Sequence, residues 1–514
     1  MRRPNSLLKG TELEAYLTKE QEYHQHALTK HISRYEKKCF IENLKELIRT
    51  IEEFINLQLE IDNDEDLQLF LAFDNSNFSF SISQINVICN RLEKQFDQGV
   101  INRLKSIMLM NIALYNGYKI SGMHESIYQK IKDNKHAILY YQSNRKNYID
   151  LLTLGYNYCQ GKIKFPFIDT LNQIQYTVDT CFGCIINAYY NRLSYYCLDN
   201  FSIDYSFDPY KASYHFENLD NLYLEPQRLG LIEQGEFTSA LENYIPKKNK
   251  RNELIFDFVE VYIALELLEV YYQKYNIEQN IYFFELKFLS SKVEPFCRDN
   301  YHIEVPIDFY ELYIMPYIKE NNLIAKYPIN LYSSSNEIFC FWKEDKIYYS
   351  NINLLTRYIY NTTMTRLGAS KRFQINSGFV FENMVSKLLL DYKFKLTNIK
   401  RINRKEFDIV AIFANKIYNF QCKNIFIDIS RVQSNPNAMA RLNKRIVSYL
   451  KRAYTKEVSR EQLILNEVGN LPINHIVVTR FPVITIEKYI INFNKLGEYL
   501  YTVVNMPHNG HPAC

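Results

Sequence analysis

The sequence predicts an α+β protein in which a large, mainly α-helical N-terminal region, residues 1–330, precedes a C-terminal α/β domain, residues 331–514, with a mixed central sheet. Apolar residues recur at three- and four-residue spacing through about the first 200 residues, which is the period of a helix with one buried face. After Pro328, short runs of β-branched and aromatic residues alternate with helical segments. Helices placed around such strands predict the mixed sheet.

Composition places the chain among ordinary globular proteins. Of its 514 residues, 47% are hydrophobic, which is enough for sizeable cores. No run of about 18 apolar residues suggests a membrane span, and the N-terminus lacks the apolar stretch of a secretory signal. Ten cysteines are scattered without a dense framework, which favours reduced thiols. We therefore expect a cytoplasmic protein that does not bind a membrane.

Helices account for most of the N-terminal region. The charged, periodic stretch from Glu12 to Glu60 opens it, and the acidic run from Asp62 to Asp66 is predicted to be a loop. The periodicity weakens near residues 202–250, which predicts a break between two subdomains and includes the basic run Pro246–Arg251. Further helices are predicted over residues 84–98, 102–115, 139–154, 178–191 and 254–275.

The C-terminal domain is predicted to begin with a small hairpin and to continue as helix, strand, hairpin, helix, strand and helix. Asn376 or Ser377 is the expected cap of the first of these helices. The predicted segments, in order, are the strands 338–342 and 346–350, a helix to Leu390, a strand over 396–402, a hairpin over 407–420, a helix over 438–454, a strand over 473–479 and a helix over 486–504.

The predicted hairpin at residues 407–420 carries the candidate site. Its strands flank Ala414-Asn415-Lys416, and Asn tolerates the positive φ of a tight turn. A two-residue loop on Ala414-Asn415 places Asp408 opposite Gln421 and Glu406 opposite Lys423. A loop on Asn415-Lys416 would instead place Asp408 opposite Lys423. In both registers the polar residues share one face of the sheet.

Alternation along the two strands divides the remaining side chains between the faces. Phe407, Ile409, Phe420 and Cys422 are expected on the face opposite Asp408. Glu382 lies upstream in the run GFVFENMVSKLLL, beside the apolar stripe of the predicted helix. The hairpin and this helix together define the candidate catalytic residues, which are Glu382, Asp408, Gln421 and Lys423, with Glu406 as an accessory acid.

These residue types suit metal-dependent hydrolysis of a phosphodiester. Mg²⁺ takes oxygen ligands and keeps several waters, so Asp408, Glu382 and the carbonyl oxygen of Gln421 are the expected metal ligands. Mn²⁺ is the expected substitute. The metal activates water and neutralises charge on the phosphate, and Lys423 would orient the water or stabilise the developing negative charge. Gln421 stands where a second strand carboxylate would bind the metal more tightly.

Positive charge is concentrated around the same segment. From Lys371 to Arg460 there are 19 Lys and Arg against 6 Asp and Glu, a net charge of +13, whereas the whole chain carries +4 and the rest therefore −9. An unbalanced basic surface next to paired acids favours phosphate binding. On the predicted helix over 438–454, the expected nucleic-acid-binding residues are Arg441, Lys444, Arg445, Lys451 and Arg452.

The order Glu382, Asp408, twelve intervening residues and then Gln421-Cys422-Lys423 resembles the PD-(D/E)xK nuclease superfamily, in the QxK variant of Mrr-type restriction endonucleases. The resemblance covers roughly residues 340–505, and Asp408 follows Phe407 rather than proline. It implies a restriction-endonuclease-like core of helix, three strands, helix and strand. It further implies Mg²⁺-dependent DNA cleavage with Asp408 as metal ligand, Glu382 as helix carboxylate and Lys423 as catalytic cation.

The sequence therefore predicts a metal-dependent DNA endonuclease, and by analogy one that acts in bacterial defence against phage or foreign DNA. Residues 1–330 are expected to bind a partner protein of a defence system, a phage trigger or a second copy of the chain. Two alternatives stay open at this point. One is a catalytically inactive protein that only binds nucleic acid or a partner, and the other is an RNA-cleaving nuclease. Either Glu382 or Glu406 completes the site.

Overall fold

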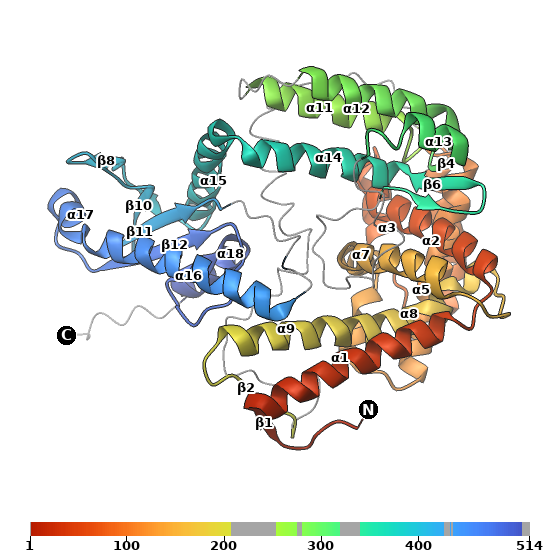
Figure 1. Ribbon diagram of the computed structural model, residues 1–514, viewed down its shortest axis with the longest axis horizontal. Coiled ribbons are helices and arrows are strands. Elements are labelled where there is room, and N and C mark those ends of the chain that lie inside the picture. The colour runs from red at the N-terminus through yellow and green to blue at the C-terminus, as the bar shows by residue number, and fades with distance from the viewer. Residues whose placement is uncertain are drawn as a thin grey trace.

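The computed structural model describes residues 2–206, 253–274, 280–318, 340–425, 432 and 435–505 (Figure 1). Within them, helices precede a C-terminal mixed sheet, so the α+β class is confirmed. Most of the break predicted near residues 202–250, including the basic run Pro246–Arg251, lies outside the described residues. No helix in the described ranges combines the length and the apolar character needed to cross a bilayer.

Each helix window predicted in the first 200 residues overlaps an observed helix. A small two-stranded sheet, β1 (Leu7–Lys9) with β2 (Ser202–Asp204), joins the two ends of this region. Side-chain caps begin several helices, as when Asp97 accepts a hydrogen bond from the Val100 amide. The helices are α1 (Gly10–Ile32), α2 (Lys37–Leu57), α3 (Asp64–Leu71), α4 (Phe78–Leu92), α5 (Gln98–Ile120), α6 (Glu125–Tyr128), η1 (Gln129–Ile131), α7 (Asn134–Tyr158), η2 (Phe167–Asp169), α8 (Thr170–Thr177), η3 (Val178–Phe182) and α9 (Gly183–Cys197).

The acidic run Asp62–Asp66 is not the loop that its charge suggested. Asn63 caps α3 by accepting hydrogen bonds from the amides of Glu65 and Asp66, and the acidic residues form the first turn of that helix. Negative side chains are favourable there because the amide groups at a helix N-terminus carry partial positive charge. The expectation of a loop was therefore wrong beyond Asn63.

A middle layer contains a four-stranded antiparallel sheet with the order β3-β4-β6-β5. The predicted hairpin near 338–350 exists as β5 (Trp342–Lys343) and β6 (Ile347–Asn351), but β6 pairs with β4 (His302–Pro306). This sheet crosses the boundary predicted at residue 330, so the hairpin does not open the C-terminal domain. The other elements are α11 (Val259–Lys274), α12 (Asn280–Val293), η5 (Glu294–Phe296), β3 (Cys297–Arg298), α13 (Ile307–Tyr313) and α14 (Ile352–Ala369).

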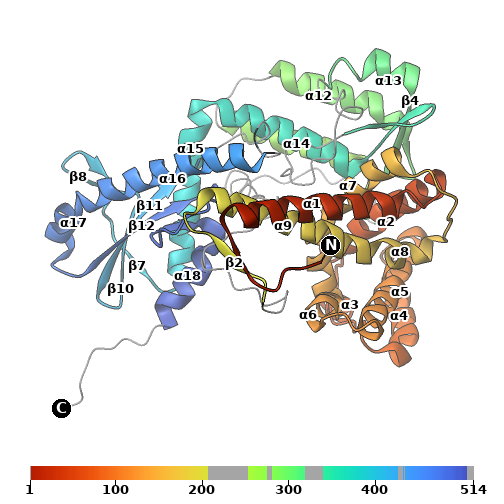
Figure 2. The same cartoon turned by 60° about the horizontal axis from the view of Figure 1, so that its bottom comes forward.

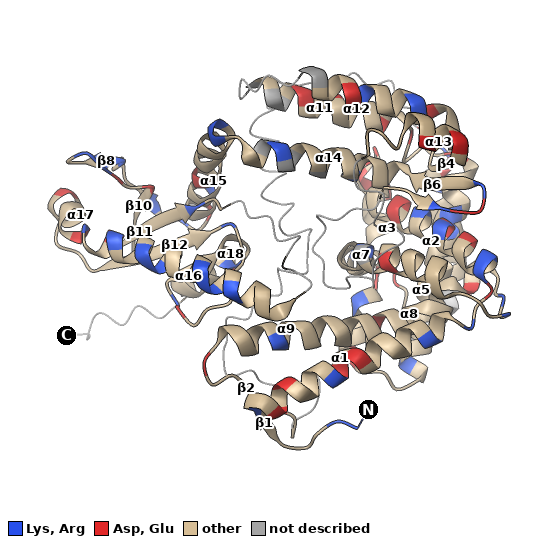
Figure 3. Cartoon of the chain, viewed as in Figure 1, with Lys and Arg blue, Asp and Glu red and all other residues tan. Residues whose placement is uncertain are grey.

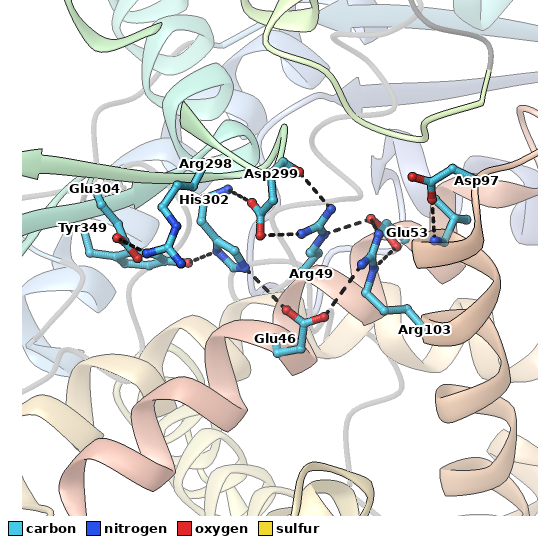
Figure 4. A network of polar contacts seen from close by, with 11 residues as sticks. Glu46, Arg49, Glu53, Asp97, Arg103, Arg298, Asp299, His302, Glu304 and Tyr349 are labelled. Atoms are coloured by element: carbon cyan, nitrogen blue, oxygen red, sulfur yellow. Dashed lines mark hydrogen bonds and ion pairs between the residues drawn. The ribbon is translucent and has the colours of Figure 1, made fainter. Parts of the chain in front are cut away.

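A network of ion pairs lies where this middle layer meets the N-terminal helices (Figure 4). Arg49 of α2 contacts Glu53 in the next turn and Asp299 in the β3–β4 turn, both at 3.0 Å. Arg103 of α5 reaches the same Glu53 at 2.6 Å. The side chain of Glu53 is only 6% exposed. An uncompensated charge is costly at such a place, so Glu53 fixes both arginines among the N-terminal helices, and the pair of Arg49 with Asp299 joins α2 to the middle layer.

The C-terminal sheet has the order β13-β12-β11-β10-β7. β11 runs parallel to β12, β12 parallel to β13, and the other pairs are antiparallel, so the predicted mixed sheet is confirmed. Helices cover both faces, with apolar residues of α15 and α18 on one and Ile464 of α17 on the other. The strands are β7 (Lys395–Leu396), β10 (Ile409–Phe413), β11 (Lys416–Lys423), β12 (Ile473–Thr479) and β13 (Ile490–Asn492), and the helices are α15 (Lys371–Asp391), α16 (Pro436–Val458), α17 (Glu461–Val468) and α18 (Phe493–Asn505).

Several predicted bounds in this domain were wrong. α15 begins six residues before Ser377 because Ser370, whose hydroxyl accepts a hydrogen bond from the Phe373 amide, is the actual cap. The predicted strand over 396–402 is split between β7 and a separate ribbon, β8 (Arg401–Ile402) with β9 (Lys405–Glu406). The segment expected as a helix over 486–504 starts with β13, and the short helix α17 was not predicted.

Helix α16 also packs on the N-terminal region, where it lies against α9 (Figure 2). Met439, Ile446 and Leu450 of α16 belong to the same buried cluster as the N-terminal helices. The C-terminal sheet is therefore linked to the helical region twice, through α16 here and through the α14–α15 connection on the other side (Figure 1).

Candidate active site

The hairpin that carries the site has the register expected for a two-residue loop. Phe413 pairs with Lys416 and Ile409 with Phe420. Ala414 and Asn415 have φ angles of 47° and 60°, the positive values that a tight two-residue hairpin turn requires. The alternative loop on Asn415-Lys416 is excluded. Asp408, directly before β10, therefore lies beside Gln421 near the end of β11.

The carboxylate of Asp408 is held by two donors from β11. The side-chain amide of Gln421 donates to Asp408 Oδ2, and the Cys422 backbone N–H donates to the same oxygen at 2.7 Å. Gln421 itself is buried, whereas Lys423, two residues later, is partly exposed at the strand end. The predicted meeting of Asp408 with the Gln421-Cys422-Lys423 segment is thus present in the structure.

The division of side chains between the two faces is confirmed for three of the four apolar residues. Ile409, Phe420 and Cys422 lie in the core under α15 and α18. Phe407 was expected with them, but it packs with Val410 on the opposite face, under α17. The backbone bends at Asp408, which interrupts the strand alternation between Phe407 and Ile409.

The bend also removes Glu406 from its predicted place. Glu406 does not face Lys423 across the hairpin. It pairs with Arg401 in the β8–β9 ribbon, and the two side chains form an ion pair. The Glu406 side chain is 71% exposed, although its charge still acts on Glu382. The chain before Asp408 folds back on itself, so its backbone pairs are made within the ribbon and not with β11.

Glu382 lies on α15, next to the buried Phe381, and its pKa responds to the charge of Asp408. Burial, followed by the negative charge of Asp408, raises the pKa of Glu382 to about 7. The ammonium groups of Lys400 and Lys423 oppose that rise. The charges of Asp408 and Lys423 both act on Glu382, so the three residues belong to one electrostatic site.

The pKa of Asp408 is also raised, chiefly by burial. The ammonium group of Lys423, the Cys422 amide and the Gln421 side chain all favour its charged form and limit the rise. Lys400 adds a further contact because its Nζ donates to the Asp408 backbone carbonyl at 2.8 Å. Two partly desolvated carboxylates close to lysines are the arrangement expected of a site that exchanges protons or binds a cation.

Oxygen donors at this site suit a hard divalent cation, because the two carboxylates and the Gln421 amide all offer oxygen. In the described ranges no group of three or more His, Cys, Asp and Glu side chains is arranged to hold a metal ion. Burial raises the pKa of the Cys422 thiol well above its usual value, and the thiol faces the apolar core. A metal here would therefore depend on Asp408, Glu382 and Gln421, with water and substrate completing its shell.

A chain of polar contacts next to Lys423 was not anticipated. Asn424 donates to the buried Ser377 Oγ of α15 at 3.0 Å, and Arg480 Nη1 donates to Asn424 Oδ1 at 3.2 Å. The Arg480 amide also donates to the Lys423 carbonyl at 3.1 Å. Arg480 is only 4% exposed. These contacts tie the ends of β11 and β12 to α15. The only feature of the sequence that could have indicated them is Arg480, directly after the apolar run INHIVVT.

The five basic residues predicted on α16 are all exposed and follow the helix (Figure 3). Lys451 forms an ion pair with Glu487 at 2.5 Å, and Lys444 lies close enough to Cys197 of α9 to affect its pKa. Arg441, Arg445 and Arg452 recur at four- and seven-residue spacing, so they share one face of the helix. Lys444 and Lys451 are turned away from these three arginines around the helix axis. The three arginines therefore form a separate strip of the predicted basic surface.

Comparison of the chain with protein-family models, curated proteins and solved structures finds no match.

Proposed function

We propose that this chain is a metal-dependent endonuclease that hydrolyses phosphodiester bonds of DNA. The observation that carries the proposal is the Asp408 carboxylate, which Gln421 and the Cys422 amide hold at the end of β11. Lys423 at the end of the same strand favours the charged form of Asp408, and the charge of Asp408 in turn raises the pKa of Glu382 on the neighbouring helix. Paired carboxylates beside a lysine are the groups that this reaction needs.

Mg²⁺, with Mn²⁺ as a substitute, is the proposed cofactor, and it would supply an activated water and charge neutralisation at the scissile phosphate. Asp408, Glu382 and the Gln421 carbonyl oxygen would hold it. Both carboxylates have raised pKa values without a cation, so bound positive charge would favour their ionised forms. The Gln421 amide adds an oxygen donor without a further negative charge.

Lys423 is proposed to act on the phosphate. It ends β11, and its side chain is partly exposed while its charge lowers the pKa of both carboxylates. An ammonium group in this position stabilises the additional negative charge that develops on the phosphate oxygens as water attacks. Its backbone carbonyl accepts a hydrogen bond from the Arg480 amide, which restrains the strand end that carries it.

Phosphate groups on either side of the cleaved bond are proposed to contact the exposed basic face of α16. Arg441, Arg445 and Arg452 supply the main contacts, and Lys444 and Lys451 supplement them. Such contacts give affinity that depends on salt and not on sequence. The helical region packs on α16 through α9, which supports a role for residues 1–330 in sensing a phage trigger or a defence partner, or in self-association.

Cleavage assays on purified full-length protein test the proposal. Plasmid DNA, single-stranded DNA and RNA are incubated in parallel with Mg²⁺, with Mn²⁺ and with chelator. We expect DNA cleavage that chelator abolishes and that Lys423→Ala and Asp408→Ala reduce at least about 100-fold, the usual effect of losing a group that stabilises the transition state. Lys416→Ala is the matched control because Lys416 begins the same strand at its opposite end.

Three outcomes would contradict parts of this proposal. Unchanged cleavage by correctly folded Asp408→Ala or Lys423→Ala would remove the assigned site. Nucleic-acid binding without cleavage of any substrate, in either metal, would favour a protein that only binds. Cleavage of RNA in preference to both DNA substrates would identify a ribonuclease.

A further inference from the structure

The β8–β9 ribbon, residues Arg401–Glu406, is a strongly basic projection beside the candidate site. Together with Lys400 it carries four basic residues against the single acid Glu406, a net charge of +3 over seven residues. Figure 1 shows the ribbon extending beyond the edge of the C-terminal sheet, and Figure 3 marks Lys and Arg positions along it in blue. Arg401 is paired with Glu406. In the described part of the chain, Arg404 and Lys405 form no ion pair, and both are exposed.

The base of the ribbon is anchored although its tip is exposed. The Phe407 amide donates to the Lys400 carbonyl at 3.1 Å and closes the ribbon. Arg460, the residue that precedes α17, donates a hydrogen bond from Nη1 to the Glu406 carbonyl at 3.2 Å. Phe407 is buried under α17. The ribbon therefore projects from a rigid base and has a defined direction relative to the sheet.

The same base borders the candidate site. Lys400 Nζ donates to the Asp408 carbonyl at 2.8 Å, and the charges of Lys400 and Glu406 both change the pKa of Glu382. A polymer whose backbone reached the two carboxylates would thus also meet the ribbon. Duplex nucleic acid is such a polymer, because its grooves lie beside the phosphate that is cleaved.

The dimensions of the ribbon match a groove. From Lys400 to the turn at Asn403-Arg404 the chain advances three residues, or about 10 Å at 3.3 Å per residue. The major groove of B-form DNA is about 8.5 Å deep and about 12 Å wide, which admits a two-stranded ribbon. The deep, narrow major groove of an RNA duplex excludes side chains.

We propose that the β8–β9 ribbon enters the major groove of duplex DNA, with Arg404 and Lys405 as its contact residues. The inference rests on the proposed nuclease function and adds the form of the substrate. Ordered duplex DNA, held by the ribbon on one side of the site, presents its backbone to Asp408 and Glu382. Arg404 at the tip reads guanine edges or neighbouring phosphates, which are the usual partners of arginine in that groove.

The turn geometry permits a clean test. Asn403 and Arg404 have φ angles of 47° and 64°, and Asn-Gly is the favoured pair for a turn with two positive φ values. Arg404→Gly therefore removes the charge while it keeps or improves the turn. Combined with Lys405→Gln, it removes two charges from the ribbon. The control pair Lys395→Gln and Lys416→Gln removes two exposed charges from the turn end of the same sheet.

Binding is measured by fluorescence anisotropy with a mixed-sequence DNA duplex and the corresponding single strand, over a series of KCl concentrations. All proteins carry Asp408→Asn so that no cleavage occurs. We expect the ribbon variant to bind the duplex about tenfold more weakly and to lower the salt slope of log K by about 2, since two phosphate-region charges are lost. The control pair should bind as its parent does. Single-strand affinity should fall by less than duplex affinity.

A second measurement does not depend on comparing affinities. Photo-crosslinking from a benzoylphenylalanine at position 405 should label the duplex, whereas the same group at position 416 should not. Duplex binding by the ribbon variant equal to that of the control pair, an equal loss on single-stranded DNA, or no crosslink from position 405 would each overturn the inference.

Failure of the ribbon and failure of the nuclease function are distinguishable. If the unmodified protein cuts DNA while ribbon variants bind normally, only the ribbon assignment falls. If ribbon-dependent duplex binding is found but the unmodified protein cuts nothing, the ribbon assignment stands and the nuclease function falls.

Discussion

Replacing Glu382 by glutamine should stabilise the C-terminal sheet at alkaline pH in the absence of metal. Folding raises the pKa of Glu382 from 4.5 to about 7, first through burial and then through the charge of Asp408. The folded state therefore holds this proton more tightly than the unfolded chain does. Below about pH 4.5 the carboxyl is neutral in both states, and the destabilisation develops as the pH rises from about 4.5 to about 7. Above that range it is complete.

The size of the effect follows from the two pKa values. Their difference of about 2.5 corresponds to about 3.4 kcal/mol at about 1.36 kcal/mol for each factor of ten. The Glu382 side chain retains contact with solvent, and solvent screening reduces the net value to about 1–2 kcal/mol. At pH 8 this free energy slows the opening-dependent exchange of buried amides by about 5- to 30-fold.

Hydrogen–deuterium exchange by mass spectrometry on the full-length protein measures this directly. Peptides covering β10 and β11 should exchange more slowly in Glu382→Gln than in the unmodified protein at pH 8, and at the same rate near pH 4.5. Asp391→Asn is the matched control because Asp391 is exposed at the C-terminal end of the same helix. Mg²⁺ should slow exchange in the unmodified protein and have little effect in Glu382→Gln.

Equal exchange of the unmodified protein and Glu382→Gln at pH 8 would refute the electrostatic account of the site. Faster exchange in the variant would show that the ionised Glu382 stabilises the fold, and the assignment of Glu382 and Asp408 to one repulsive pair would then be wrong. A stabilisation of the same size in Asp391→Asn would indicate a general effect of net charge.

Two further predictions concern the Gln421 side chain of β11 and the buried ion pairs of Glu53 among the N-terminal helices. Gln421→Glu, which places a carboxylate on β11, should tighten Mg²⁺ binding because the site gains a negative charge. Calorimetry measures this, and unchanged or weaker binding would contradict a ligand role at this position. Glu53→Gln should lower the free energy of unfolding by about 3 kcal/mol because it leaves Arg49 and Arg103 without their buried counter-ion. The control Glu42→Gln, in the exposed pair with Lys38, should lower it by less than about 1 kcal/mol. Equal losses would show that burial of the network is unimportant.

Sequence patterns predicted the structure correctly where interactions between residues close in the chain decide it. Alternating apolar residues and Asn415 in the turn predicted the β10–β11 hairpin and limited its register to two possibilities, and the observed pairs select the loop on Ala414-Asn415. That register alone brings Asp408 beside Gln421. The strand Ile473–Thr479 was predicted with its observed bounds, because a buried parallel strand is a continuous apolar run with clear ends.

The predicted limits of helices and strands were wrong where the local sequence is compatible with more than one structure. Ser370 and Ser377 are both acceptable helix caps by type, and only the hydrogen bond from the Phe373 amide selects Ser370. The segment before α18 contains enough apolar residues for a helix, but β12 offers an open edge on which Ile490–Asn492 pairs. Pairing with a neighbour outweighs local preference at such a position.

Tertiary structure alone decided how the site is completed. Local periodicity records which residues are apolar, but not which segment covers them. Arg460 and the Lys400 carbonyl hold the chain before Asp408 in a separate ribbon, so Glu406 is turned toward Arg401 and away from β11. The sequence by itself determined the α+β class, the hairpin and the closeness of Asp408 to the Gln421-Cys422-Lys423 segment, whereas the choice between the two hairpin registers came from the structure. Contacts between segments far apart in the chain determined the bend at Asp408 and the place of Glu382, because those contacts satisfy backbone and charged groups that no local pattern can pair.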